Sequence, residues 1–177
     1  MLGRASMNVF LRNVDKNLET WALLFFYSLL VTTMAVEVVR RELFSLSSIW
    51  GEEIVRYAFI YLVWIGAAAG IRDRAHIRID VAFTYLRERT KAVFYLFGDF
   101  VMLGLSVVAL WYSFETVQVS WKFGSVTDGL RLSKVWFLIA VPIGFTLIIY
   151  RLVQSILRDF HHLRNGMPVF TGKKMFD

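Results

Sequence analysis

The sequence WGEEIVRYAFIYLVWIGAAAGIR, residues 50–72, decides how this chain folds. It opens with Glu52, Glu53 and Arg56, continues without a charge from residue 57 to residue 71, and ends in Arg72. A helix of about 20 residues crosses about 30 Å of hydrocarbon, and side chains that snorkel at its ends make up a small deficit. A soluble amphipathic helix would carry a polar stripe along its length, which this stretch lacks. The stretch therefore predicts a membrane-spanning helix.

Three further apolar runs have the same character. Residues 20–36, 100–114 and 135–150 contain no charged side chain, and 57% of the chain is hydrophobic, against roughly 45–50% in soluble domains. Adding the flanking apolar residues gives four spans at about 18–39, 51–71, 92–114 and 134–153. We therefore expect an all-α integral membrane protein with four transmembrane helices, in a single membrane domain of residues 1–177. Pro142 is expected to kink the fourth span, because its ring removes a helix hydrogen bond.

The segment between spans two and three has its own pattern. Ile79, Ala82, Phe83 and Leu86 follow the spacing i, i+3, i+4, i+7, which is typical of one apolar helix face. The pattern is compatible with a short amphipathic interfacial helix on the membrane surface, and equally with a loop and an early start of span three.

Lysine and arginine are unevenly distributed between the two sides of these spans. The N-terminal tail, the segment between spans two and three and the C-terminal tail hold fourteen, whereas the opposite side holds six. Because cytoplasmic segments are enriched in these residues, both termini are expected in the cytoplasm. The net charge of +6 lies where topology requires it, without the aromatic–basic interleaving of a nucleic-acid-binding surface. We therefore expect contact with membrane lipids and no nucleic acid.

The charged opening of span two admits two interpretations. Arg56 follows Glu52 by four residues and Glu53 by three, so a carboxylate can meet the guanidinium on one helical face. Both acids also suit the positive end of the helix dipole. The group is either a self-neutralised helix start or a polar contact surface for another membrane subunit. No nucleophile or metal cluster accompanies it, so no catalytic residues are predicted.

Two acidic residues lie inside the predicted spans. Glu37 is near the outer end of span one, within reach of Arg40, Arg41 or Arg56, and Asp99 is about two turns into span three. Asp99 could meet Arg72 or Arg74 from the inner end of span two. An intramembrane acid is a functional candidate by default. Structural ion pairs, binding of a coupling ion or proton, and contact with a partner subunit all remain open for both.

The chain offers little for cofactor or metal chemistry. It has no cysteine, which removes thiolate catalysis and iron–sulfur clusters. His76 and Asp80 are four residues apart and would share a helical face, but two ligands do not make a convincing metal site. We expect no cofactor and no metal. Gly66 and Gly70 form a small-xxx-small surface in span two, which permits close approach of another helix, internal or external.

In their order and spacing these residues resemble a known family, the small membrane subunit (Q or DctQ-type) of the tripartite ATP-independent periplasmic (TRAP) transporters. The resemblance rests on Trp50, Glu52, Glu53 and Arg56 opening span two, followed by GAAAG at residues 66–70. It then continues in RDRAHIRIDV, where Arg72, His76, Ile77 and Asp80 follow the pattern R-x-x-x-H-I-x-x-D. Size, span number and predicted topology extend it over nearly the whole chain.

The resemblance implies a role and partners. A chain of this family would sit in the bacterial inner membrane as a non-enzymatic subunit that braces a large elevator-type carrier, the M subunit. A periplasmic substrate-binding protein would deliver an organic acid, and a sodium gradient would drive its import. Glu52, Glu53 and Arg56 would then help to order the outer end of the brace.

A second hypothesis comes from a different class of protein. A small four-span exporter could act alone, with Glu37 as its proton-coupled cation site. Glu37 lies beside Arg40 and Arg41 rather than at the centre of a span, and the uneven lysine and arginine distribution suits one fixed orientation. Both features favour the subunit hypothesis.

Overall fold

The structure, a computed structural model, describes residues 2–46, 48–73 and 88–164, and every regular element in them is helical. The elements are α1 (Leu2–Phe44), α2 (Ile49–Arg72), α4 (Glu88–Lys122), α5 (Val135–Leu138) and α6 (Ala140–Arg164). Four stretches are long and apolar enough to cross a membrane: Asn17–Phe44, Ile49–Arg72, Val93–Lys122 and Val135–Arg164. The prediction of an all-α protein with four membrane-spanning helices is confirmed. The predicted amphipathic pattern at residues 79–86 lies outside the described residues.

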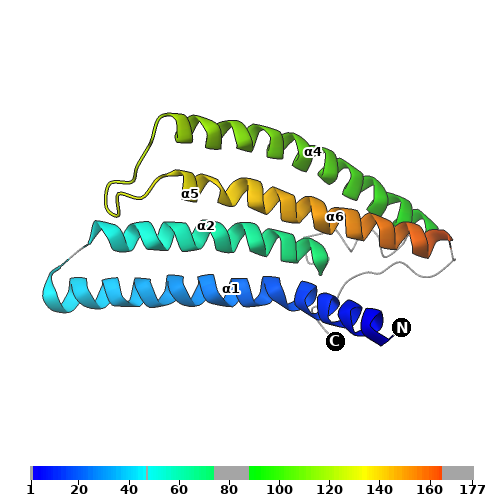
Figure 1. Ribbon diagram of the computed structural model, residues 1–177, viewed down its shortest axis with the longest axis horizontal. Helices are drawn as coiled ribbons and strands as arrows, with labels where there is room; N and C mark the ends of the chain where they lie inside the picture. The colour runs from blue at the N-terminus through cyan, green and yellow to red at the C-terminus, as the bar shows by residue number, and fades with distance from the viewer. Residues whose placement is uncertain (1, 47, 74–87, 165–177) are drawn as a thin grey trace.

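The four long helices lie side by side in one layer. Helix α1 packs on α2, α2 packs on α6, and α6 packs on α4, so α1 and α4 form the two edges of the row (Figure 1). We call one end of the layer the loop end, because it holds residues 44–46, 48–49 and 123–134. The other is the terminal end, where α1 begins and α6 ends (Figure 1).

Small side chains let the middle of the layer pack closely. Ala68 and Ile71 of α2 form the core with Ile148 and Leu152 of α6, and all four are buried. On the other side of α2, a Cβ built on Gly66 would lie 3.7 Å from Leu23 of α1. The GAAAG segment therefore packs against internal neighbours on both sides.

The fourth span is interrupted where the sequence predicts a kink. Helix α5 ends at Leu138, and α6 begins at Ala140. Leu138 is the residue four positions before Pro142, and Pro142 has no N–H to donate to its carbonyl oxygen. Helical bonding resumes when Ile143 donates to the carbonyl of Ile139 at 3.1 Å. The position of the break follows from the missing proline N–H.

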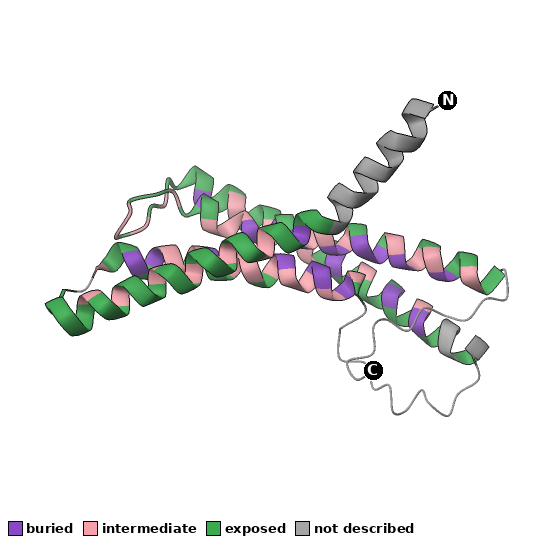
Figure 2. Cartoon of the chain, turned by 90° about the horizontal axis from the view of Figure 1, so that it is seen from below, coloured by how far each residue is buried: buried purple, intermediate pink, exposed green. Residues whose placement is uncertain are grey.

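The edges of the layer keep their apolar side chains outward. In the most apolar part of the α1 span no residue is buried, whereas 39% of the residues in the most apolar part of the α5–α6 span are buried. In Figure 2, most of the coloured part of α1 is exposed. Trp21, Phe25 and Tyr27 are all more than half exposed. Such a surface suits lipid tails or a second membrane protein, which replace water around it.

Candidate functional site

Glu53 anchors the connection between α4 and α5. Its carboxylate accepts hydrogen bonds from the backbone N–H groups of Gly129 at 2.6 Å and Leu130 at 2.9 Å. Within the connection, the Thr127 N–H donates to the Leu132 carbonyl at 2.8 Å and holds residues 127–132 in a loop. Glu53 is itself buried, so water does not solvate its charge. The two backbone N–H groups stabilise the carboxylate instead. The anchor holds this connection against the start of α2.

The neighbouring acid has a different partner. Arg56 donates to Glu52 at 3.4 Å, and both side chains are 71% exposed. An ion pair this exposed adds at most about 1 kcal/mol to stability. The two acids at the start of α2 therefore have different roles. Glu53 binds the connection between α4 and α5, and Glu52 forms an ion pair with Arg56.

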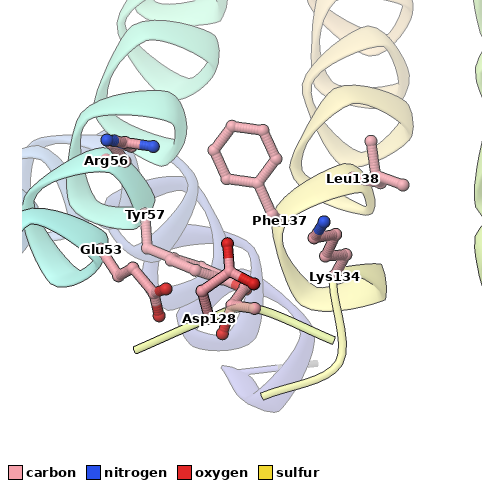
Figure 3. A pocket seen from close by; sticks show the side chains of 8 residues that line it. Glu53, Arg56, Tyr57, Asp128, Lys134, Phe137 and Leu138 are labelled. Atoms are coloured by element: carbon pink, nitrogen blue, oxygen red, sulfur yellow. The ribbon is translucent and has the colours of Figure 1, made fainter. Parts of the chain in front are cut away.

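A pocket opens between α2 and α5 at the loop end. Its volume is about 370 Å³. In Figure 3 the side chains of α2 face those of α5 across it, with Asp128 of the connection in view between them. The rings of Tyr57 and Phe137 meet edge to face at 5.5 Å. The pocket is lined by Glu53, Arg56, Tyr57, Thr127, Asp128, Lys134, Phe137 and Leu138.

A second polar group joins α1 to α2 at the same end. The Glu37 carboxylate accepts a hydrogen bond from the Ser48 hydroxyl and lies 3.3 Å from Arg40. A Cβ at Gly51 would come within 2.6 Å of Glu37 Cγ, so the glycine leaves the space in which this side chain lies. The Arg40 guanidinium also lies over the Trp50 ring, 5.2 Å from the centre of that ring.

The terminal end holds a buried ion-pair cluster, here called the Glu19 cluster (Glu19, Arg72 and Arg151). Arg151 of α6 donates to Glu19 of α1 at 2.6 Å. The Arg72 guanidinium of α2 lies 2.9 Å from the other oxygen of the same carboxylate. The side chains of Glu19 and Arg151 are only 2% and 5% exposed. Three helices therefore meet at one carboxylate.

Asp99 joins the fourth helix to this end. It is 2% exposed and accepts a hydrogen bond from Ser155 of α6 at 2.8 Å. Arg72, one of the two partners considered for it from the sequence, forms ion pairs with Glu19 and Asp73. Arg74, the other, lies outside the described residues, as do His76 and Asp80. Asp99 therefore connects α4 to α6 through a hydroxyl.

The sequence predicted only some of these contacts. It did not single out Glu19 or Arg151, which look like ordinary charged flanks of spans one and four. One signal was available: Glu19, Arg72 and Arg151 all lie where their spans meet the same side of the membrane. It also gave no partner outside α2 for Glu53. Among the described residues, no group of three or more potential metal ligands gathers in one place.

The chain matches known proteins over most of its length. Residues 29–162 match the family model described as "Tripartite ATP-independent periplasmic transporters, DctQ component". A sialic acid TRAP transporter small permease protein, SiaQ of Vibrio cholerae, is 23% identical over 82% of this chain and 83% of its own length. A C4-dicarboxylate TRAP transporter small permease protein, DctQ of the same species, is 24% identical over 78% of this chain and 69% of its own.

One similar protein is much longer. The isethionate TRAP transporter permease protein DctMQ of Oleidesulfovibrio alaskensis is 26% identical over 62% of this chain. The match spans only 17% of that protein.

Proposed function

This chain belongs to the DctQ component family of the tripartite ATP-independent periplasmic transporters, and from that membership we propose that it braces a large elevator-type carrier subunit. It is a TRAP small permease subunit and a multi-pass membrane protein. In the proposed role it carries out no chemistry and contains no transport site. It widens and steadies the static part of the carrier in the bilayer.

The proposed transport cycle imports an organic acid. The similar proteins are named for sialic acid, C4-dicarboxylate and isethionate transport, and all three substrates are organic anions. In the proposed system a periplasmic substrate-binding protein delivers the acid, and a sodium gradient drives uptake through the large M subunit. Selectivity then belongs to those partners.

One observation carries the bracing role: the helices form a single layer rather than a closed bundle. A four-helix bundle turns its apolar faces toward a shared core. Here α1 and α4 lie at opposite edges (Figure 1), and the α1 span buries none of its most apolar stretch. A layer of this shape has a broad apolar surface on which a larger membrane protein can pack.

The similarity to the long isethionate permease protein supports a large partner subunit for this chain. Its matched region is a small part of a permease protein, so a segment like this chain is there covalently joined to much more polypeptide. The lysine and arginine distribution supports cytoplasmic termini in the bacterial inner membrane. In that orientation the loop end faces the periplasm and the binding protein.

The exporter alternative is less well supported. Its coupling site would need a carboxylate that exchanges protons or cations during transport. Glu37 instead accepts a hydrogen bond from Ser48 and pairs with Arg40 at the loop end of the layer.

Affinity purification of the tagged chain from its native membrane in mild detergent tests the proposal. Mass spectrometry should find a stoichiometric, much larger polytopic protein with it. Recovery of the chain alone, or of a homodimer that moves cations in vesicles, would overturn the bracing role. A tagged, unrelated four-span protein from the same membrane is the control for detergent-carried contaminants.

A further inference from the structure

The pocket at the loop end presents charges of both signs without pairing all of them. Asp128 and Lys134 are exposed, and neither forms an ion pair in the part of the chain that the structure describes. Arg56 adds a second cation, held only by its exposed contact with Glu52. A molecule that carries both an anion and a cation could pair with these cations and with Asp128, which lies between the two walls (Figure 3).

Tyr57, which lines the pocket, carries an unused hydroxyl group. The Tyr57 hydroxyl is shielded from solvent and has no hydrogen-bond partner among the residues that the structure describes. A shielded hydroxyl without a partner is destabilising. A bound oxygen-rich group that displaces the atoms covering this hydroxyl would give it an acceptor. The wall formed by Tyr57, Phe137 and Leu138 is apolar apart from this oxygen, as an amphiphile requires.

The depth of the pocket narrows the class of ligand. Helix α2 has 24 residues, so it is about 36 Å long and exceeds the hydrocarbon core of about 30 Å only slightly. Glu53 and Arg56 lie within its first two turns. Trp50, Trp121 and Trp136 are exposed at the same end of the layer, and tryptophan is enriched at the membrane–water interface. The pocket therefore lies at the level of phospholipid headgroups.

We propose that this pocket binds one phospholipid with a phosphate and a primary ammonium in its headgroup, of the phosphatidylethanolamine class. The phosphate lies near Lys134 and Arg56 and accepts a hydrogen bond from Tyr57. The ammonium group donates to Asp128, and the glycerol and upper acyl chain lie along Phe137 and Leu138. An anionic headgroup such as phosphatidylglycerol leaves Asp128 without a cation. This binding site does not depend on the transporter assignment.

Native mass spectrometry of the purified full chain tests the site. The wild type, reconstituted with equal amounts of phosphatidylethanolamine and phosphatidylglycerol, should retain one phosphatidylethanolamine molecule. The double variant Asp128→Asn/Lys134→Gln should lower that occupancy about tenfold, because two charge-assisted contacts are lost. Lys122→Gln is the matched control, since this exposed lysine ends α4 and does not line the pocket.

Tyr57→Phe separates binding from folding. It keeps the ring contact with Phe137 and removes only the unpartnered oxygen. We expect this variant to be at least as stable as the wild type without lipid, because the unsatisfied oxygen is gone, and to retain several-fold less phosphatidylethanolamine. Equal retention by the wild type and both pocket variants, or preference for phosphatidylglycerol, would overturn the proposal. So would a photo-crosslinker at Leu138 that captures a polypeptide in place of the lipid.

Discussion

Arg151 and Glu19 are 132 residues apart in the sequence, yet Arg151 Nε lies 2.6 Å from Glu19 Oε1. Both side chains are almost fully buried. In the layer α2 lies between α1 and α6. The contact therefore links α1 directly to a helix that is not its neighbour. The pair ties an edge of the layer to its centre.

Replacing Glu19 should strongly destabilise the protein. Glu19→Ala leaves the buried Arg151 without its carboxylate, and breaking a buried pair costs about 3–5 kcal/mol. Thermal unfolding in detergent should show this as a lower midpoint, by about 2–4 °C per kcal/mol for a chain of this size. Glu42→Ala is the control, because Glu42 and its partner Arg41 are about two-thirds exposed. Equal midpoints for the two variants would contradict a stabilising Glu19 cluster.

The loop end offers two adjacent acids for a matched comparison. Glu53→Ala removes the acceptor for Gly129 and Leu130, and hydrogen bonds to charged groups are stronger than those between neutral groups. Hydrogen exchange at these two amides should therefore accelerate at least about tenfold. Glu52→Ala should leave the same amides unchanged, because its exposed pair with Arg56 lies outside the anchor. If both variants accelerate exchange equally, Glu53 has no special role.

The contact between α2 and α6 depends on a missing side chain. A Cβ at Gly144 would lie 2.6 Å from Trp64 Cβ and 2.8 Å from its ring, so Gly144→Ala must push the two helices apart. We expect a loss of about 1–3 kcal/mol, as for other overpacked cores. Gly104→Ala meets nothing within 4 Å and should be neutral or gain about 0.5–1 kcal/mol from helix propensity. Unfolding midpoints measured side by side decide between the two outcomes.

Glu37 separates the subunit from the exporter hypothesis. Glu37→Gln keeps the size of the side chain and an oxygen that can accept from Ser48. We expect the assembled transporter to retain full uptake in proteoliposomes, with at most a small loss of stability. An exporter that used Glu37 for coupling would lose transport entirely. Glu42→Gln, at an exposed site on the same helix, controls for the loss of one negative charge.

The spans were predictable because their signal is local. Four apolar runs of membrane length specify four helices, and Pro142 predicts a kink in the fourth span, which the structure places three residues earlier, at Ile139. The Glu52–Arg56 and Glu37–Arg40 contacts also follow from helical spacing. Each of these inferences needs only residues that are close in the sequence.

The remaining contacts depend on which helices become neighbours. Glu53 meets Gly129, 76 residues away, and no spacing rule links the two. The order of helices in the layer is decided by close packing, such as Trp64 over Gly144, which a hydrophobic pattern does not encode. The Glu19 cluster was missed for the same reason, since α6 had to be placed beside α2 first.

The order of helices in the layer has a consequence for biosynthesis. A ribosome delivers α1, α2 and α4 before α6, but α4 has its main packing partner in α6, and so does the free side of α2. After three spans have entered the membrane, the chain consists of a paired hairpin and a lone helix. Glu19 and Arg72 both belong to that hairpin, while Arg151 has not yet emerged. The last helix therefore completes the layer by insertion between earlier ones, and a translation product truncated before it should be recognised by membrane quality control as unfinished.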